Sequence, residues 1–172
     1  NSQLKRSQTL IVQQFKEMVR NPPMGITVAI EDGNIDKWNI TMLGPPGTPY
    51  ENGIFPCSLQ FTSEYPTKPP VFRFLTPDFV HPNVFSDGKV CISILHEADD
   101  IYHQHEPASE KWRPILGVEQ VLVSIMSLLN EPNPNSPANP DVTKLFRHDP
   151  EEYRKLVIQM VQRTIQDAEK KK

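Results

Sequence analysis

The stretch ITVAIEDGNIDKWNITMLGPPGTPYENGIFPCSLQFTSEYPTKPPVFRFL, residues 26–75, decides the fold of this chain. It holds four runs of alternating or continuous apolar residues, each bounded by turn-forming residues, which is typical of β-strands. The runs are Ile26-Thr27-Val28-Ala29-Ile30, Trp38-Asn39-Ile40-Thr41-Met42-Leu43, Phe55 to Phe61 and Val71 to Leu75. Because the separators are short, neighbouring strands are expected to pair antiparallel as a meander. Cys57 shares the inward face of the third run and is predicted to be a core residue.

Proline shows where helices can form on either side of this sheet. The chain has 18 prolines in 172 residues, about twice the usual ~5%, and they crowd its middle, which excludes a helical bundle or coiled coil. Residues 1–21, 115–131 and 151–168 carry apolar side chains at helical spacing, and a shorter helix is expected at 141–148. The sequence therefore predicts an α+β fold: an N-terminal helix, a four-stranded antiparallel meander, then core and C-terminal helices.

Composition narrows the class of protein. The length suits one domain, and a net charge of -3 gives no overall positive field for nucleic acid. Cys57 and Cys91 are the only cysteines, too few for a disulfide framework, which favours a reducing, cytosolic setting. No stretch approaches the ~18 consecutive apolar residues that would span a membrane.

One irregular segment, residues 81–95, combines groups that suit covalent chemistry. Asn83 lies eight residues before Cys91, and the turn Ser86-Asp87-Gly88 between them could bring the two side chains together. A thiol can act as a nucleophile, and a carboxamide can stabilise an oxyanion in acyl transfer. The competing interpretation is a buried structural cysteine, because free cysteine is among the most buried residue types.

Several separated motifs occur here in one order. His81-Pro82-Asn83 begins ten residues before Cys91, Tyr65-Pro66-Thr67-Lys68-Pro69-Pro70 precedes it, and Trp112-Arg113-Pro114 follows. Together they resemble the ubiquitin-conjugating enzymes from residue 3 to residue 168. The resemblance implies a single catalytic domain over 3–168 with the fold described above.

In such an enzyme the thiol receives ubiquitin as a thioester from an activating enzyme and passes it to a lysine with a RING-type ligase. The resemblance implies no cofactor, since ATP is used upstream by the activating enzyme. We expect a monomer that is cytoplasmic, with the cytosolic face of the endoplasmic reticulum and the nucleus as further locations.

The resemblance assigns roles at the site residue by residue. Cys91 is the expected nucleophile, and Asn83 is expected to stabilise the oxyanion or to order the loop beside it. His81 is expected to be structural, hydrogen-bonded within its turn. Ser136 occupies the position where family members carry an acidic residue or a serine at the entrance to the site. Equally, it could be a loop serine that completes a turn.

An insertion at residues 96–111 separates the site from Trp112. It carries five carboxylates and one lysine, a net charge of -4, and it resembles the acidic-loop subclass that serves endoplasmic-reticulum-associated degradation and cullin-type ligases. We expect polyubiquitin chains for proteasomal degradation, with His96, Asp99 and Asp100 guiding the acceptor lysine. Carboxylates attract that cation but also favour its charged form, so they help orientation more than deprotonation. A solvated polar loop is the alternative.

Histidine distinguishes this loop from related ones, in which Gly or Pro is commoner. Histidine is a common metal ligand, so His96, His103 and His105 are candidates for a metal site. We expect none, because the sequence shows no helical or hairpin spacing that would organise the ligands. Exposed histidines that titrate near neutrality are expected instead.

The resemblance also implies two docking surfaces. Lys5 and Arg6 on the first helix are expected to bind the activating enzyme, and the ligase surface is expected to comprise Pro66, Thr67, Trp112, Pro114 and Ile115. Thr67 stands where a large hydrophobic residue is common, which puts the choice of ligase in doubt. Alternatively, the two cations form a solvated helix face and the tryptophan covers the core.

Two other functions share this fold. A non-catalytic adaptor would lack the catalytic cysteine, whereas this chain keeps Cys91 and Asn83. A carrier of a ubiquitin-like modifier is the other alternative, and the long acidic insertion favours ubiquitin over it.

Overall fold

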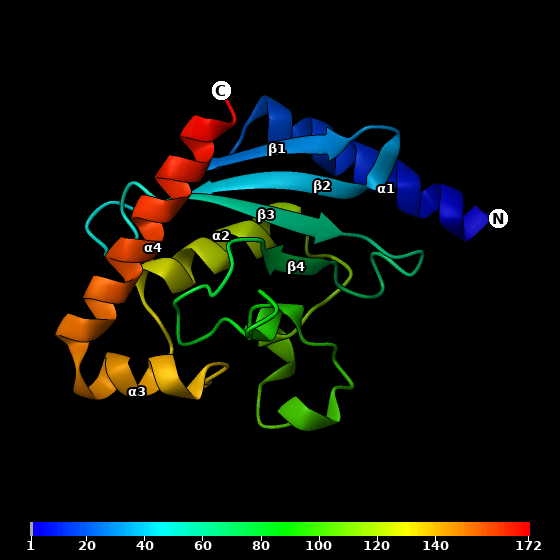
Figure 1. Cartoon of the computed structure of the whole chain (residues 1–172). Helices are drawn as coiled ribbons and strands as arrows, with labels where there is room; N and C mark the ends of the chain where they lie inside the picture. The colour runs from blue at the N-terminus through cyan, green and yellow to red at the C-terminus, as the bar shows by residue number, and fades with distance from the viewer. Residues whose placement is uncertain (1) are drawn as a thin grey trace.

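The computed structural model describes residues 2–172, so Asn1, at the start of the first predicted helix, lies outside the described residues. The four helices and four strands follow the predicted order (Figure 1). They are α1 (Ser2–Arg20), β1 (Ile26–Glu31), β2 (Asn34–Leu43), β3 (Ile54–Gln60), β4 (Val71–Phe74), α2 (Val118–Asn130), α3 (Pro140–His148) and α4 (Pro150–Lys170). Three short 3-10 turns, η1 (Ser93–Leu95), η2 (Ile101–His103) and η3 (Ala108–Glu110), lie between β4 and α2.

The four strands form one antiparallel sheet in the order β1-β2-β3-β4, which confirms the predicted meander. Cys57 on β3 pairs with Ile40 on β2 and with Phe74 on β4. All three side chains are buried, so Cys57 is the core residue that the alternation predicted. This register gives β3 and β4 a shared apolar face. The turn at 84–90, which leads to the candidate site, pairs with β4 through Lys89 and Gly88.

Helix α1 packs on the sheet through a narrower apolar stripe than its sequence pattern predicts. Ile11 and Met18 are buried, and Phe15 makes an edge-to-face contact with Trp38, with ring centroids 5.2 Å apart. Leu4 and Val19 are exposed instead. In Figure 1, α1 and α2 lie behind the sheet and α4 runs across one end of it.

The remaining helices close the core. Val121, Leu122 and Ile125 of α2 are fully buried, as its almost continuous apolar pattern predicts. The Tyr50 and Tyr153 hydroxyl groups lie 2.7 Å apart and join the loop after β2 to α4. Within residues 2–172, no helix is long and apolar enough to cross a membrane.

Candidate active site

A tight turn brings Asn83 and Cys91 together. Val84 pairs with Val90 across it, and the backbone N–H of Cys91 donates to the carbonyl oxygen of Asn83 at 2.8 Å. Gly88 closes the turn with φ +89°, and a Cβ at this position would overlap the carbonyl oxygen of Phe74. Glycine is needed here both for the positive φ and for the close approach to β4.

The Asn83 side chain is fully buried and uses all its hydrogen-bonding groups within the protein. Its Nδ2 donates to the carbonyl oxygens of Asn133 and Ser136, both at 2.8 Å, and its Oδ1 accepts from the Asn133 backbone N–H at 2.9 Å. The carboxamide therefore holds residues 133–136 beside Cys91. Of the two roles expected for Asn83, loop ordering is the one that this geometry performs.

His81 is a structural member of the same turn, as expected. Its Nδ1 accepts the backbone N–H of Asn83 at 2.9 Å, which places the ring proton on Nε2, 2.7 Å from the carbonyl oxygen of Leu128. Burial lowers the pKa of His81 to about 4, although the bond to Leu128 opposes the shift. The imidazole is therefore neutral near pH 7 and joins the site to α2.

Cys91 is half-buried at the edge of a depression of about 400 Å³. The walls come from the residues after Cys91, the acidic insertion, Leu128 at the end of α2, and the following loop that carries Asn133 and Ser136. Burial raises the pKa of the Cys91 thiol, and the negative charge of Glu106 raises it further. The sulfur is thus accessible from one side and is held mainly as the thiol.

Residues 96–111 fold into consecutive turns. Backbone N–H groups donate back across three residues repeatedly, as from Asp100 to Glu97 and from Glu106 to His103. The Trp112 N–H donates to the His96 carbonyl oxygen at 2.9 Å, so the two ends of the insertion meet. The insertion is therefore a compact loop that begins and ends beside the site.

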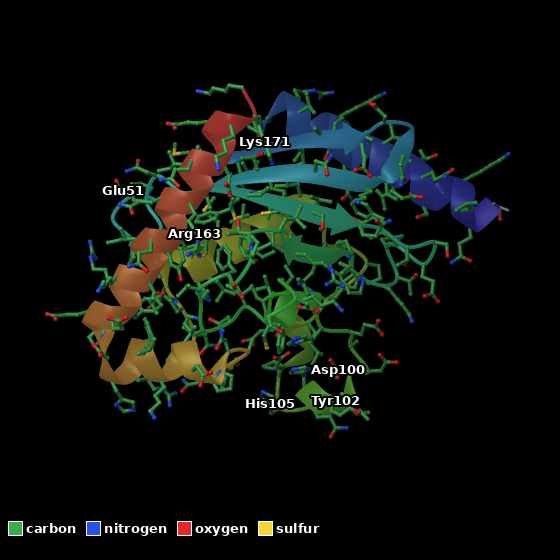
Figure 2. The ribbon with its side chains drawn as sticks, in the orientation of Figure 1. Glu51, Asp100, Tyr102, His105, Arg163 and Lys171 are labelled. Atoms are coloured by element: carbon green, nitrogen blue, oxygen red, sulfur yellow. The ribbon has the colours of Figure 1, made fainter. Side chains whose placement is uncertain are left out.

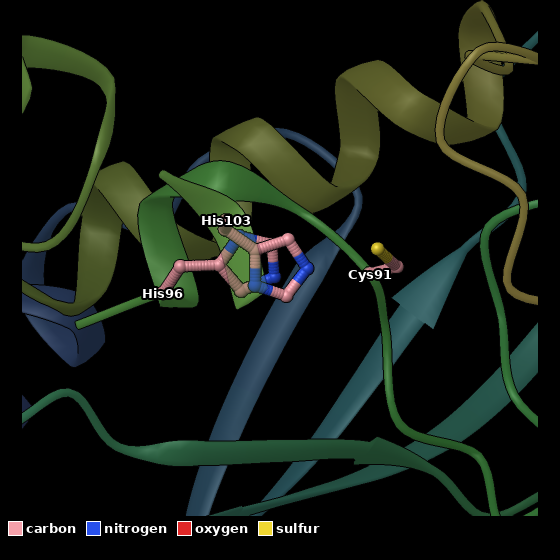
Figure 3. Close-up of side chains that lie close together, drawn as sticks. All are labelled: Cys91, His96 and His103. Atoms are coloured by element: carbon pink, nitrogen blue, oxygen red, sulfur yellow. The ribbon is translucent and has the colours of Figure 1, made fainter. Parts of the chain in front are cut away.

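Two of its histidines are covered, and the expectation that all three are exposed was wrong. The His96 and His103 rings stack with centroids 3.6 Å apart, leaving 12% and 27% of these side chains exposed (Figure 3). Their packing explains the difference, because each ring shields one face of the other. His105 is exposed. One ligand atom from each of Cys91, His96 and His103 lies within 4.8 Å of the other two.

The two aspartates that were expected to guide an acceptor lysine differ in their surroundings. Asp100 accepts from the Tyr102 backbone N–H at 2.9 Å and from His103 Nδ1 at 2.7 Å, and these bonds lower its pKa. Asp99 is exposed. Figure 2 shows Asp100, Tyr102 and His105 together on the lobe that projects below the sheet. Asp100 thus shapes the loop, whereas Asp99 faces solvent.

The residues expected to bind partners lie on α1 and around Trp112, and a shallow depression lined by Gln14, Glu17 and Ile115 adjoins both sets. Lys5 and Arg6 are exposed on the first turns of α1. Near the site, the indole Nε1 of Trp112 donates to the Pro66 carbonyl oxygen at 2.9 Å, joining the loop before β4 to the segment before α2. Trp112 itself is buried, whereas Thr67, Pro114 and Ile115 beside this junction are exposed, as is Arg113.

Sequence reasoning missed Asn133 and Glu106. Asn133 follows Asn83 by 50 residues and takes part mostly through its backbone, which leaves no mark in the residue pattern. Glu106 Oε2 lies 2.8 Å from His96 Nδ1, and it was counted only as one of the loop's carboxylates.

The fold and the site together define a class of protein. A half-buried thiol beside an asparagine-ordered wall on an α+β scaffold suits acyl transfer through a cysteine thioester. The family model described as ubiquitin-conjugating enzyme matches residues 10–161, so the chain belongs to the ubiquitin-conjugating enzymes. Members of this family are thioester-forming transferases that work with ubiquitin, an activating enzyme and a ligase.

Named relatives agree with this assignment. The chain is 42% identical to "Ubiquitin-conjugating enzyme E2 15" of Schizosaccharomyces pombe over 161 residues, 93% of this chain and 96% of the relative. It is 42% identical to "Ubiquitin-conjugating enzyme E2 14" of Arabidopsis thaliana over 90% of this chain and 93% of the relative. It is 40% identical to "Ubiquitin-conjugating enzyme E2 G2" of Homo sapiens over 90% of this chain and 94% of the relative.

Proposed function

We propose that Cys91 is the residue that carries ubiquitin. The observation that supports this most is the depression of about 400 Å³ that gives its sulfur access to a partner. Cys57, the other cysteine of the chain, is fully buried on β3, and burial raises its pKa well above the usual value. Of the two cysteines, Cys91 is the one with room for an acyl group beside its sulfur.

Loading is a thioester exchange. The Cys91 thiol loses its proton, and the thiolate attacks the thioester carbonyl that joins ubiquitin to the activating enzyme. The new C–S bond forms as the bond to the activating enzyme's cysteine breaks, and that sulfur takes up a proton. The raised pKa of Cys91 makes it a poorer leaving group than an unperturbed thiol, which slows loss of ubiquitin to water.

Transfer is an aminolysis. A neutral lysine amine attacks the Cys91 thioester, an amide bond forms, and the Cys91 thiolate leaves while the amine loses its proton to solvent. The wall at residues 133–136, held by Asn83, borders the space that the acceptor enters. Ser136 is placed there through its backbone carbonyl, and its hydroxyl group cannot itself deprotonate a lysine.

The acidic insertion supports chain building as the outcome of transfer. Its carboxylates attract a lysine of a second ubiquitin toward Cys91, with Asp99 exposed for this contact and Asp100 and His96 shaping the loop. Lys68, in the loop before β4, lies 4.0 Å from Glu97 and connects the insertion to the ligase surface. We place the products in polyubiquitin-dependent protein degradation.

The docking surfaces complete the proposal. Lys5 and Arg6 on α1 bind the activating enzyme, and a RING-type ligase binds the surface around Pro66, Thr67, Pro114 and Ile115, which Trp112 supports from below. The enzyme needs no cofactor of its own. It acts in the cytoplasm, with the cytosolic face of the endoplasmic reticulum and the nucleus as further locations, and these are reducing settings in which the Cys91 thiol stays free.

A loading assay tests the proposal. Incubation with activating enzyme, ATP and ubiquitin gives an adduct one ubiquitin heavier that thiols cleave, and Cys91→Ala gives none. Cys57→Ala is the matched control and still forms the adduct. An adduct that persists in Cys91→Ala, or its absence in the parent, contradicts the proposal. The same assay with a ubiquitin-like modifier and its own activating enzyme tests the alternative carrier function.

A further inference from the structure

Cys91, His96 and His103 form a cluster that the acyl-transfer chemistry does not explain. Their ligand atoms lie within 4.8 Å of one another, and all three side chains are partly buried. Figure 3 shows the two stacked imidazole rings beside the thiol. Turn η2 brings His103 back over His96, although the two residues are seven positions apart in the chain. The loop therefore supplies the organisation that its sequence spacing does not reveal.

Each ring is oriented by a carboxylate. His96 Nδ1 lies 2.8 Å from Glu106 Oε2, and His103 Nδ1 lies 2.7 Å from Asp100 Oδ2. A carboxylate accepts the Nδ1–H of a neutral imidazole and leaves the Nε2 lone pair available. This carboxylate-histidine pairing is the arrangement that orients histidine ligands in metal sites and raises their basicity.

We propose that Cys91, His96 and His103 bind a Zn²⁺ ion. One thiolate and two imidazoles are a ligand set that zinc prefers, and three protein ligands leave a fourth tetrahedral position for water. Zinc bond lengths of ~2.0 to 2.3 Å place ligand atoms about 3.5 Å apart. Side-chain rotations bring the three atoms from within 4.8 Å of one another to that distance.

Zinc at this site competes with ubiquitin for the sulfur of Cys91. Binding replaces the thiol proton with a Zn–S bond and releases that proton to solvent, with no redox change. A zinc-bound sulfur is not free to attack the activating enzyme's thioester, so the ion is a reversible inhibitor of loading. This inhibition rests on the proposed role of Cys91, whereas metal binding does not.

Direct binding is the first test. Reduced, metal-free protein is titrated with Co²⁺, whose thiolate complexes absorb in the near ultraviolet, and Zn²⁺ then displaces the cobalt in competition with a chelator. One ion binds per chain with a thiolate-to-cobalt band, Cys91→Ser abolishes the band, and His103→Asn weakens zinc binding at least about tenfold. His148→Asn, on the exposed end of α3, is the matched control and binds like the parent. Far-ultraviolet circular dichroism checks that each variant is folded.

The second test measures loading with and without zinc. Zinc lowers the loading rate of the parent at least about tenfold, and a chelator restores it. In His103→Asn, the ratio of the loading rate without zinc to the rate with zinc falls toward one. Zinc that acted on the activating enzyme instead would slow loading of His103→Asn as much as that of the parent, and His148→Asn, expected to respond like the parent, controls for histidine replacement in general. A missing thiolate band, or equal zinc affinity of His103→Asn and the parent, overturns the inference. A protein that binds zinc through Cys91 but never loads ubiquitin would instead contradict the proposed function.

Discussion

Asn83 and Asn133 are hydrogen-bonded to each other in both directions. The Asn83 Nδ2 donates to the Asn133 carbonyl oxygen at 2.8 Å, and the Asn133 backbone N–H donates to Asn83 Oδ1 at 2.9 Å. The second Nδ2 hydrogen goes to the Ser136 carbonyl oxygen. The one buried carboxamide thereby fixes a wall of the site that lies 50 residues away in the chain.

Asn83→Ala lowers the free energy of unfolding by about 2–4 kcal/mol, because three buried hydrogen bonds are lost. Urea denaturation measures the change. Asn135→Ala, at an exposed position in the same wall, is the control and changes stability by less than about 0.5 kcal/mol. Unchanged stability with transfer slowed about 100- to 1000-fold would instead assign Asn83 a direct oxyanion role.

His81 makes stability depend on pH in the acid range. Its folded-state pKa, about 4, lies below the unfolded value of 6.5, so protonation favours the unfolded chain. Its contribution is fully present above pH 6.5 and is lost as pH falls through 4, a change of about 3 kcal/mol. Urea denaturation of the parent and His81→Gln at several pH values measures it. If the free energy of unfolding changes with pH equally in the parent and in His81→Gln between pH 6.5 and 4, this role is refuted.

Gly88→Ala destabilises the protein by at least about 2 kcal/mol, because the methyl group meets the Phe74 carbonyl oxygen and φ is positive. Gly33→Ala is the matched comparison, since Gly33 also has positive φ but has no atom within 4 Å of the added carbon. It is expected to cost only about 1 kcal/mol. Thermal unfolding of both variants separates the two effects, and equal losses would rule out the steric contribution.

Ile115→Ala weakens ligase binding about tenfold without lowering stability. Ile115 is 84% exposed beside the junction of Trp112 and Pro66, so its truncation removes interface area but little core packing. Met24, 94% exposed after α1, supplies the control Met24→Ala. Ligase-stimulated discharge of ubiquitin is measured for both. If both variants respond alike to the ligase, the proposed surface is wrong.

Asp99→Asn slows chain extension about fivefold while loading continues normally, since one exposed charge contact contributes about 1 kcal/mol. Asp100→Asn differs, because it removes the carboxylate that accepts hydrogen bonds from the Tyr102 backbone N–H in η2 and from His103 Nδ1. It is therefore expected to alter the loop as well. Rates of ubiquitin chain formation and of loading are measured for each variant and for the double variant. A double variant that extends chains as fast as the parent eliminates the acceptor-guiding role.

The parts of the fold that sequence predicted are those that local pattern controls. Alternation placed Cys57 in the core, and the prolines at 22, 23, 140 and 150 marked helix ends within a residue or two. The apolar stripe of α1 was predicted too wide, because Leu4 and Val19 are exposed, Val19 directly beside the buried Met18.

The candidate site was predictable only where its residues lie close in the chain. The turn at 86–88 predicted that the Asn83 amide and the Cys91 thiol approach each other. The structure joins the two residues through a backbone hydrogen bond, while the Asn83 side chain bonds to Asn133 and Ser136. The hydrogen bond from the Asn83 side chain to the Asn133 backbone and the stacking of His96 on His103 depend on tertiary packing. The spacing of residues in the sequence does not encode that packing.

The bond from the Trp112 N–H to the His96 carbonyl oxygen makes the insertion a segment that leaves and rejoins the domain at one point. Lengthening such a loop adds closure entropy of only about 0.6 kcal/mol for each doubling. The exposed positions of the insertion that do not line the Cys91 depression, such as Asp99 and Tyr102, can therefore diverge while the catalytic site is preserved. Grafting a different insertion between His96 and Trp112 is a route to a new acceptor preference on the same enzyme.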